Sequence, residues 1–374
     1  MLSSVFAKNT QKNTDGRITN VICNSAKQGL IPQREYFDKN IANSDNTNGY
    51  YIIEENDFVY NPRKSVDAPY GPISSYKYTE AGIVSPLYLC FRAKKEINPA
   101  FFEWYFRSSA WHRYVYMSGD SGARHDRVSI KDDTFFAMPI NIPSAHEQAQ
   151  IAIFLERIEQ RIEMQRALVD SLKKYKRGVV AAIFSHQLKF SDATGNPYPE
   201  WTSCTLQDAV DFLDGQRKPL ESADRAKRQG QYPYYGASGI IDYIDDFIFD
   251  EPLLLLGEDG ANILNRSTPL CFIAEGKYWV NNHAHVMRPK AGQNIKFLCE
   301  LLESLDYTRY NTGTAQPKLN QDKCRRIGLA LPVYEEQCHI ADFLSAFDQR
   351  TDKAQSILDY LLSNRDGLLQ QLFI

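Results

Sequence analysis

The chain has 374 residues, 43% of them hydrophobic and 24% charged, which favours two or three globular domains and excludes a disordered or fibrous protein. Its net charge of -3 excludes a general polycation that coats nucleic acid, but not a sequence reader with local basic surfaces. Composition alone therefore indicates a multi-domain globular protein and gives no function.

The first segment, residues 1–142, has the character of a mixed domain. It is rich in Tyr, Phe, Gly, Asn and Pro, and short alternating runs such as Tyr50–Ile53 predict strands joined by loops. The aromatic stretch at 99–114 predicts one buried helix.

A long amphipathic helix is predicted in the next segment, 143–189. Ten positions from Ile151 to Ile183 follow one another at alternating steps of four and three residues, the 3.5-residue period typical of coiled coils. No proline interrupts this stretch, and a helix of about 37 residues would be roughly 55 Å long. Two of the ten positions, Gln165 and Lys176, are polar, which indicates register control or contact with another subunit.

The third segment, residues 190–331, is similar to the first in composition. Its alternating runs, such as 278–280, predict strands, and residues 293–306 predict a helix that corresponds to 99–114. Both halves of the chain therefore have the same order: a mixed domain with an internal helix, a basic loop, a proline and a long helix.

The fourth segment, residues 332–374, repeats the second at a constant offset of 189 positions and without a gap. The identical pairs include Pro143 and Pro332, Glu147 and Glu336, Gln148 and Gln337, Phe154 and Phe343, and Phe184 and Phe373. Neither helix can bury its apolar stripe alone, so we expect the two repeats to pair as a coiled coil. The charges favour this, because residues 147–177 carry five acids and seven bases whereas residues 335–374 carry seven acids and three bases. Two core helices of one large domain are the alternative.

A basic loop precedes each long helix, at 122–131 and at 313–323. The two loops align Gly to Gly, with Arg127 opposite Lys318. Arg, Lys, Gln and Asn side chains are suited to forked contacts with purine edges and to phosphate binding. Both loops are therefore candidate nucleic-acid contacts, with ordinary solvated charges as the alternative for any single residue.

Three further patches combine aromatic residues, glycine and basic or amide side chains, at residues 60–71, 215–236 and 279–285. Each of them could face a polyanion. Packing or turn formation explains each of them equally well.

No arrangement of residues indicates catalysis convincingly. Asn61–Lys64 lacks the second proline and the aromatic residue of the Asn-Pro-Pro-aromatic motif of adenine methyltransferases, and the glycine loops that bind dinucleotides or ATP are missing. His283 and His285 have no cysteine or carboxylate at ligand spacing, which favours a structural role over a metal site. The acidic turn at 258–259, with Lys277 downstream, is only faintly similar to a nuclease triad.

Signals for membrane insertion, secretion and disulfides are also missing. The longest aliphatic run, Leu253–Leu256, is far shorter than the roughly 20 residues of a membrane helix, and the first residues lack the order of a signal peptide. The seven cysteines are scattered and include no Cys-x-x-Cys pair, which argues against a disulfide framework or a zinc ribbon. We therefore expect a cytoplasmic protein with free thiols.

The whole pattern resembles one known family, the specificity subunits of type I restriction–modification systems. The resemblance is carried by the repeats 143–184 and 332–373 with their Pro-x-x-x-Glu-Gln-x-x-Ile-x-x-Phe-Leu motif, by the Tyr-Pro-Glu-Trp sequence that ends at Trp201, and by the loop 313–320. The start at Met1 departs from the family pattern, because the usual tryptophan segment does not precede it. A short N-terminal truncation or an alternative start is left open.

The resemblance implies an α+β fold in which two mixed α/β target recognition domains alternate with two long helices, paired as an antiparallel coiled coil with pseudo-two-fold symmetry. The recognition domains would be residues 1–142 and 190–331, and the helices residues 143–189 and 332–374. Each domain would read one half of a bipartite double-stranded DNA site. The helices would set the spacer between the half-sites and dock two methyltransferase subunits.

The resemblance also implies that this chain is not an enzyme and holds neither a cofactor nor a metal. Methyltransferase subunits would bind S-adenosylmethionine and flip the adenine, and motor-nuclease restriction subunits would bind ATP and Mg. The residues expected to contact DNA are Arg63, Lys64, Tyr70, Arg124, His125, Arg127, Arg217, Lys218, Asn281, Asn282, His283, Gln316, Lys318 and Asn320. A coiled-coil scaffold that binds only proteins is the main alternative function, and a stand-alone nuclease is a weaker one.

Overall fold

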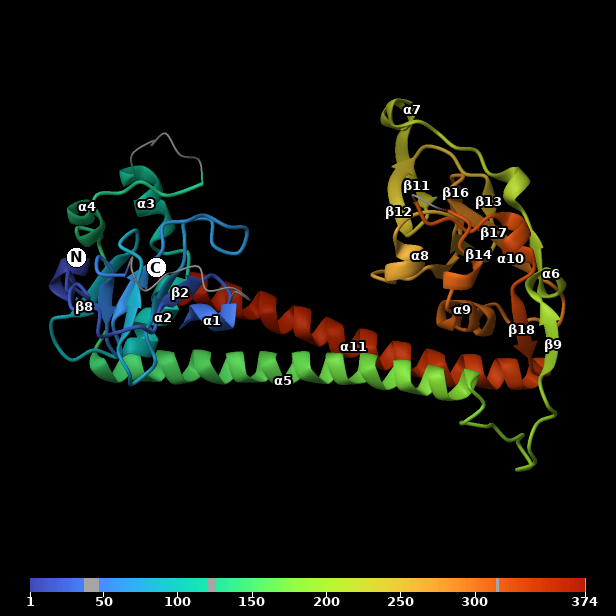
Figure 1. Cartoon of the computed structure of the whole chain (residues 1–374), viewed down its shortest axis with the longest axis horizontal. Helices are drawn as coiled ribbons and strands as arrows, with labels where there is room; N and C mark the ends of the chain where they lie inside the picture. The colour runs from blue at the N-terminus through green and yellow to red at the C-terminus, as the bar shows by residue number, and fades with distance from the viewer. Residues whose placement is uncertain (37–46, 120–125, 314–315, 374) are drawn as a thin grey trace. The chain divides into compact units, whose positions relative to one another are not determined.

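The computed structural model describes residues 1–36, 47–119, 126–313 and 316–373. They form two compact units: unit 1 is Met1–Arg166 with Ser356–Ile374, and unit 2 is Ala167–Gln355. Two long helices, α5 (Ala145–Phe184) and α11 (Tyr334–Leu372), contribute to both units (Figure 1). Each unit thus combines a mixed domain with one section of both long helices.

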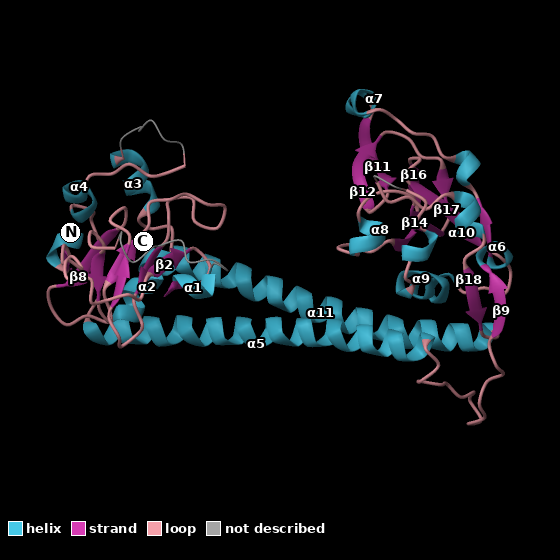
Figure 2. Cartoon of the chain, viewed as in Figure 1, coloured by secondary structure: helices cyan, strands magenta, loops and turns pink. Residues whose placement is uncertain are grey.

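Unit 1 contains a four-stranded antiparallel sheet with the strand order β1-β8-β5-β6. Its strands are β1 (Phe6–Lys8), β8 (Leu89–Ala93), β5 (Phe58–Tyr60) and β6 (Ile73–Ser75). Figure 2 shows the strands of this unit in magenta, with β8 labelled. Two antiparallel pairs join β2 (Ile22–Ser25) to β3 (Gly29–Pro32) and β4 (Tyr51–Ile53) to β7 (Gly82–Val84). The short helices are α1 (Gln33–Tyr36), α2 (Pro99–Arg107), α3 (His112–Ser118) and α4 (Asp132–Phe136).

The core of unit 1 is mainly aromatic. The ring of Phe6 lies edge-on to the rings of Phe58, Phe91 and Phe102, at centroid distances of 5.3, 5.2 and 5.1 Å. Pairs of this geometry add about 0.5–1.5 kcal/mol each beyond their buried area. Because Phe102 belongs to α2, these contacts hold that helix against the sheet.

The prediction of a single helix at 99–114 is wrong, because the structure has two helices there, α2 and α3. Ser108 ends α2 with an extended backbone, and its hydroxyl donates to the carbonyl oxygen of Tyr105 at 2.6 Å. A serine hydroxyl that bonds back to the preceding turn competes with helical hydrogen bonding. The indole N–H of the buried Trp111 donates to the carbonyl oxygen of Phe106 at 2.9 Å. This bond holds the segment between the two helices against the core.

Unit 2 contains an antiparallel sheet with the order β10-β17-β14-β15. Its strands are β10 (Val210–Phe212), β17 (Ala284–Pro289), β14 (Leu253–Gly257) and β15 (Cys271–Ala274). A second sheet has the order β12-β11-β16-β13, made of β12 (Gly239–Ile244), β11 (Gln229–Gly236), β16 (Lys277–Val280) and β13 (Phe249–Asp250). The remaining elements are the pair β9 (Thr202–Thr205) and β18 (Gly328–Leu331), with α6 (Leu206–Ala209), α7 (Ser222–Lys227), α8 (Asn262–Asn265), α9 (Ile295–Ser304) and α10 (Gln321–Arg325).

The repeat extends from the long helices into the mixed domains. The sheets β1-β8-β5-β6 and β10-β17-β14-β15 have the same strand order relative to the sequence, and α2 and α9 pack on the equivalent strands β6 and β15. Both helices begin at an asparagine cap, Asn98 or Asn294, whose side-chain oxygen accepts a backbone N–H at 3.1 Å. The helix expected at 293–306 is confirmed as α9.

The long helices pair in an antiparallel direction within each unit. In unit 1, Arg365 of α11 contacts Glu159 of α5 at 3.3 Å, and in unit 2, Lys176 of α5 contacts Asp348 of α11 at 2.7 Å. All ten predicted seam positions of α5 are buried or half-buried, as are the first nine of α11, whereas Leu372 is exposed. The coiled-coil expectation is therefore confirmed.

Within the described residues, no helix combines the length and the apolar character needed to cross a membrane.

The Pro-x-x-x-Glu-Gln motif marks the start of each long helix. The side-chain amide of Gln148 donates to the carbonyl oxygen of Pro143 at 2.9 Å, and Gln337 donates to Pro332 at 3.0 Å. Each glutamine thus satisfies a backbone acceptor just ahead of its own helix, where regular helical bonds do not reach. This local bond explains why the two residue types recur five positions apart in both repeats.

Candidate nucleic-acid interface

In unit 1 the basic loop lies against the residues that follow β5. Arg63 and Arg127 form an isolated antiparallel bridge. Its two hydrogen bonds, both 2.9 Å long, run from Val128 N–H to Pro62 O and from Lys64 N–H to Asp126 O. This pairing brings two stretches that are about sixty residues apart in the sequence into one basic surface.

A groove of about 930 Å³ borders this bridge. Its lining includes the cations of Lys27, Arg63, Lys64 and Arg127. The Nε of Arg127 is buried and has no hydrogen-bond partner among the described residues. The carboxylate of Asp126 lies 3.8 Å from this Nε, and the Arg127 side chain as a whole is 31% exposed. A phosphate or base from outside the chain would therefore meet the exposed part of the guanidinium.

In unit 2 the second basic loop makes the same bridge with the residues that follow β14. Here the paired residues are Asp259 and Lys318. The equivalent hydrogen bonds run from Leu319 N–H to Glu258 O at 2.7 Å and from Gly260 N–H to Pro317 O at 3.0 Å. The side chain of Asn311 shapes the loop, because its oxygen accepts the backbone N–H of Lys318 at 2.8 Å.

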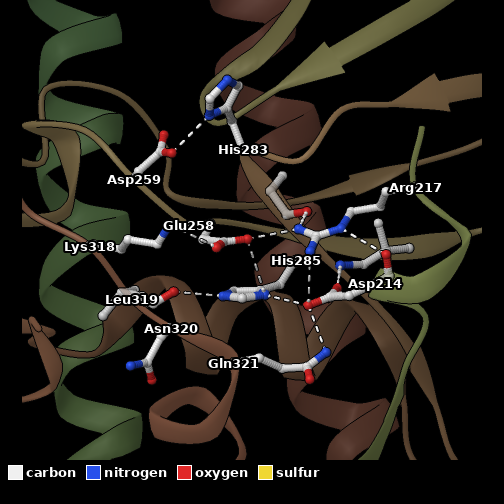
Figure 3. A network of polar contacts seen from close by, with 12 residues as sticks. Asp214, Arg217, Glu258, Asp259, His283, His285, Lys318, Leu319, Asn320 and Gln321 are labelled. Carbon is white, nitrogen blue, oxygen red and sulfur yellow. Dashed lines mark hydrogen bonds and ion pairs between the residues drawn. The ribbon is translucent and has the colours of Figure 1, made fainter. Parts of the chain in front are cut away.

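Unlike unit 1, unit 2 surrounds this bridge with carboxylates (Figure 3). Glu258 accepts from Arg217 at 2.8 Å and lies 3.3 Å from the Lys318 ammonium. Asp259 lies 2.8 Å from Nδ1 of His283. Arg217 and Lys318, two of the cations expected to contact DNA, thus already pair with a carboxylate within the chain. Arg217 is only 14% exposed.

The carboxylate of Asp214 holds the buried imidazole of His285. Nδ1 of His285 lies 2.7 Å from Asp214, and Nε2 lies 2.8 Å from the carbonyl oxygen of Leu319. Both ring nitrogens face acceptors, and only the imidazolium form can donate from both of them. Burial alone would lower the pKa of His285, but the hydrogen bond to Asp214 and the attraction of its negative charge outweigh it and raise that pKa to about 10. The basic loop is therefore fixed at Leu319 by a charged imidazole.

Asp214, Glu258 and His285 bring ligand-type atoms within 4.8 Å of one another, but they do not fit a metal ion. A metal-binding histidine must be neutral and offer a lone pair, whereas both nitrogens of His285 act as donors. The guanidinium of Arg217 contacts both carboxylates, at 3.4 Å from Asp214 and 2.8 Å from Glu258. Protein cations thus balance these acids.

The charge of His285 gives unit 2 a pH-dependent stability. The folded-state pKa of about 10 lies above the ordinary histidine value of about 6.5. The stabilisation is therefore complete below about pH 6.5 and is lost as the pH rises toward 10, at up to about 1.4 kcal/mol per pH unit. Urea unfolding between pH 6.5 and 9 is expected to show this decline in the wild type and a smaller one in His285→Gln. Equal slopes would contradict the charged imidazole.

Some of the expected DNA contacts are exposed, although two of the exposed ones, His283 and Lys318, also pair with carboxylates of the chain. The exposed ones are Arg63, Lys64, Lys218, Asn282, His283, Gln316 and Lys318. Tyr70 stacks on His112 at a centroid distance of 4.6 Å, and the oxygens of Asn281 and Asn320 accept the backbone N–H groups of His283 and Lys323. Arg124 and His125 lie outside the described residues.

The sequence interpretation missed the acidic partners of the second loop. The structure brings Asp214, Glu258 and His285 together from positions far apart in the sequence, so no ligand spacing indicates them. The faint nuclease similarity is not supported, because Lys277 lies over the ring of Phe247 at 4.7 Å and Glu258 pairs with other cations. The one available signal was the acidic turn after the strand Leu253–Leu256.

The sequence matches the family of the type I restriction modification DNA specificity domain over residues 5–174 and again over residues 198–361. A protein named as a type I restriction enzyme specificity subunit in Haemophilus influenzae is 32% identical over 155 residues, which are 41% of this chain and 38% of that protein. The type I restriction enzyme EcoprrI specificity subunit of Escherichia coli is 28% identical over 154 residues, 41% of this chain and 37% of that protein. Each alignment thus spans less than half of the relative's length.

Solved structures share the fold along the whole chain. The S subunit of a type I restriction–modification system from M. genitalium has a TM-score of 0.58 at 16% identity and covers 100% of this chain and 95% of its own. A chain from a structure on complex assembly and conformational transition of the type I R-M system has a TM-score of 0.62 at 14% identity and covers 99% and 95%. With the sequence match present in both halves, the chain belongs to the type I restriction–modification DNA specificity domain family.

Proposed function

We propose that this chain reads a bipartite double-stranded DNA site as the specificity subunit of a type I restriction–modification complex. The observation that carries the proposal is the recurrence of one arrangement in both units: a basic loop bridged to the end of a central strand. Two similar readers in one chain suit a site with two half-sites, one for each unit. The paired long helices would set the unread spacer between them.

In this proposal the chain supplies specificity and its partners supply the chemistry. Methyltransferase subunits would bind S-adenosylmethionine and methylate a flipped adenine, and motor-nuclease subunits would use ATP and Mg. The carboxylates of unit 2 fit this division, since protein cations occupy the positions that a catalytic metal would need.

The DNA-binding role can be tested on the complex of this chain with its methyltransferase subunits. Arg127→Ala is expected to weaken binding to the cognate duplex by about tenfold, as for loss of one good arginine contact. Lys318→Ala should weaken binding less, because Glu258 already lies 3.3 Å from that ammonium, and should lower the salt slope by about one. If both variants kept the affinity and salt dependence of a DNA-binding wild type, neither loop would contact DNA.

The biological site can be found by modified-base sequencing of cells with and without the gene. Loss of one split, adenine-methylated motif on deletion is the expected result. An unchanged methylome, in cells that express the chain and its methyltransferase partner, would favour the scaffold function instead.

Equivalent exposed apolar residues on the long helices suit the docking of two copies of one partner. Unit 1 presents Phe154 of α5 and Ile357 of α11, which are 48% and 38% exposed. Unit 2 presents Phe343 and Leu168, their counterparts at the offset of 189, which are 36% and 44% exposed. Side chains of this kind are favoured at interface centres. Each unit would therefore bind one methyltransferase subunit with the same surface.

Phe154→Asp and Phe343→Asp separate the two docking surfaces. Each single variant is expected to bind one methyltransferase subunit and the double variant none, because a buried unpaired carboxylate costs several kcal/mol. Multi-angle light scattering of the purified complexes gives the stoichiometry. Met164→Asp is the matched control, since Met164 is exposed and position 353 of the repeat holds a lysine. Two bound subunits in the double variant would exclude this surface.

A further inference from the structure

The two equivalent bridges carry opposite charges at the position that follows the central strand. In unit 1 this position is Arg63, and its bridge partner is Arg127. In unit 2 the position is Asp259, and its bridge partner is Lys318. The backbone hydrogen bonds correspond one for one, so the difference lies in the side chains and not in the local fold.

Arginine and aspartate at one position of a DNA reader select opposite base chemistry. An arginine donates to the O6 and N7 acceptors of guanine, whereas an aspartate accepts from the N4 amino group of cytosine. An aspartate also repels the phosphate backbone. It therefore lowers affinity unless a donor on a base edge compensates for it.

The carboxylate of Asp259 is held in place and only partly engaged. Oδ2 lies 2.8 Å from Nδ1 of His283, and no hydrogen bond reaches Oδ1 within the described part of the chain. His283 is itself fixed, because its N–H donates to the side-chain oxygen of Asn281 at 2.8 Å and its carbonyl oxygen accepts Glu258 N–H at 2.8 Å. Asp259 thus has one ordered oxygen and one that is available as an acceptor.

The neighbouring cation does not cancel this carboxylate. The Lys318 ammonium lies 3.3 Å from Glu258, which also accepts from Arg217. Glu258 thus pairs with both cations, and the half-exposed imidazole of His283 is the side-chain partner of Asp259 among the described residues. In unit 1 the corresponding place holds two guanidinium groups at the edge of a groove, and the carboxylate of Asp126 lies 3.8 Å from that of Arg127, while Arg63 forms no ion pair within the described part of the chain.

We propose that the two units read different hydrogen-bonding classes of base: unit 1 reads the acceptor edge of guanine through Arg63 and Arg127, and unit 2 reads an amino group, of cytosine or adenine, through Asp259. His283 acts as a positioning residue for that carboxylate. The proposal rests on the proposed function, since it requires both loops to face DNA.

The test uses the assembled complex of the full chain and its methyltransferase subunits, with selection from a library of duplexes randomised over both half-sites. Asp259→Ala, which removes the acceptor, is expected to lose about tenfold or more of the preference for an amino-bearing base at one position of one half-site. Asp259→Glu should keep the class of base, and Arg63→Gln should alter only the other half-site. Asp250→Ala on β13, which removes an exposed carboxylate of the same unit, is the matched control and should change nothing.

His283→Phe separates positioning from direct contact. It removes the hydrogen bond to Asp259 but keeps an aromatic ring, so the preference at the same base should weaken without moving to another position. Wild-type preferences at every position of the Asp259→Ala complex would overturn the proposal while the bipartite preference, and with it the proposed function, stands. A wild-type complex without any bipartite preference would overturn the proposed function itself.

Discussion

Replacement of Asp214 by asparagine is expected to lower the free energy of unfolding of unit 2 by about 3–5 kcal/mol. Removal of one partner from a buried ion pair leaves the other charge without compensation, and this is the usual size of that effect. The His285 side chain is fully buried, and Arg217 is also among the partners of this carboxylate. Urea denaturation at pH 7 measures the change, with Asp250→Asn as a control that alters the same charge on an exposed strand residue.

The pH dependence of Asp214→Asn and the stability of a double variant show whether the loss comes from the buried charge. Asp214→Asn should also let His285 become neutral, so its stability should fall less steeply between pH 6.5 and 9 than that of the wild type. Combining Asp214→Asn with His285→Gln should be less destabilising than Asp214→Asn alone, because it removes both charges and keeps polar groups toward the Val286 N–H and the Leu319 carbonyl oxygen. A loss below about 1 kcal/mol in Asp214→Asn would show that the pair contributes no more than an exposed one.

The long helices could be predicted from the sequence because their signals are local. The 3.5-residue period, the proline before each repeat and the recurrence at a fixed offset all lie within short windows. The structure confirms the helices as Ala145–Phe184 and Tyr334–Leu372. The break at Ser108 escaped the same reasoning, because a continuous aromatic stretch predicts a buried helix and a single hydroxyl ends it.

The polar network of unit 2 could not be predicted, because nothing local encodes it. Asp214 and His285 are 71 positions apart, and they meet because η3 (Asp214–Gln216) follows β10 and His285 lies on its neighbour β17. Strand pairing depends on long-range packing more than on local preference. Basic residues were therefore identified as DNA contacts without the acids that already bind two of them, Arg217 and Lys318.

Two charged residues lie in the helix seam, one in each repeat. Lys176 and Arg365 are counterparts at the offset of 189, and so are their partners Asp348 and Glu159. Each unit thus has one ion pair of the same type between its sections of α5 and α11. A cation in an apolar seam lowers stability in wrong registers, where its partner is missing, which supports the role in register control.

Lys176→Glu is expected to destabilise unit 2 by about 3 kcal/mol or more. The lysine ammonium lies 2.6 Å from Glu300 and 2.7 Å from Asp348, so the variant would place three carboxylates together at a half-buried site. Arg365→Glu should destabilise unit 1 less, because Arg365 contacts its partner across the helices, Glu159, at 3.3 Å and also pairs with an exposed neighbour, Asp366. Hydrogen exchange followed by mass spectrometry resolves the two units in one experiment.

Charge reversal of the partner tests whether the pair itself is responsible. Asp348→Lys in the Lys176→Glu background should restore only part of the stability, because Glu300 still faces the new carboxylate. Glu159→Lys in the Arg365→Glu background should restore most of it, since no third acid contacts that pair among the described residues except the exposed Asp366. A double-mutant cycle gives the coupling free energy in each unit. Equal rescue in both units would mean that Glu300 does not share Lys176, and that the two sections of the seam are equivalent in energy as well as in sequence position.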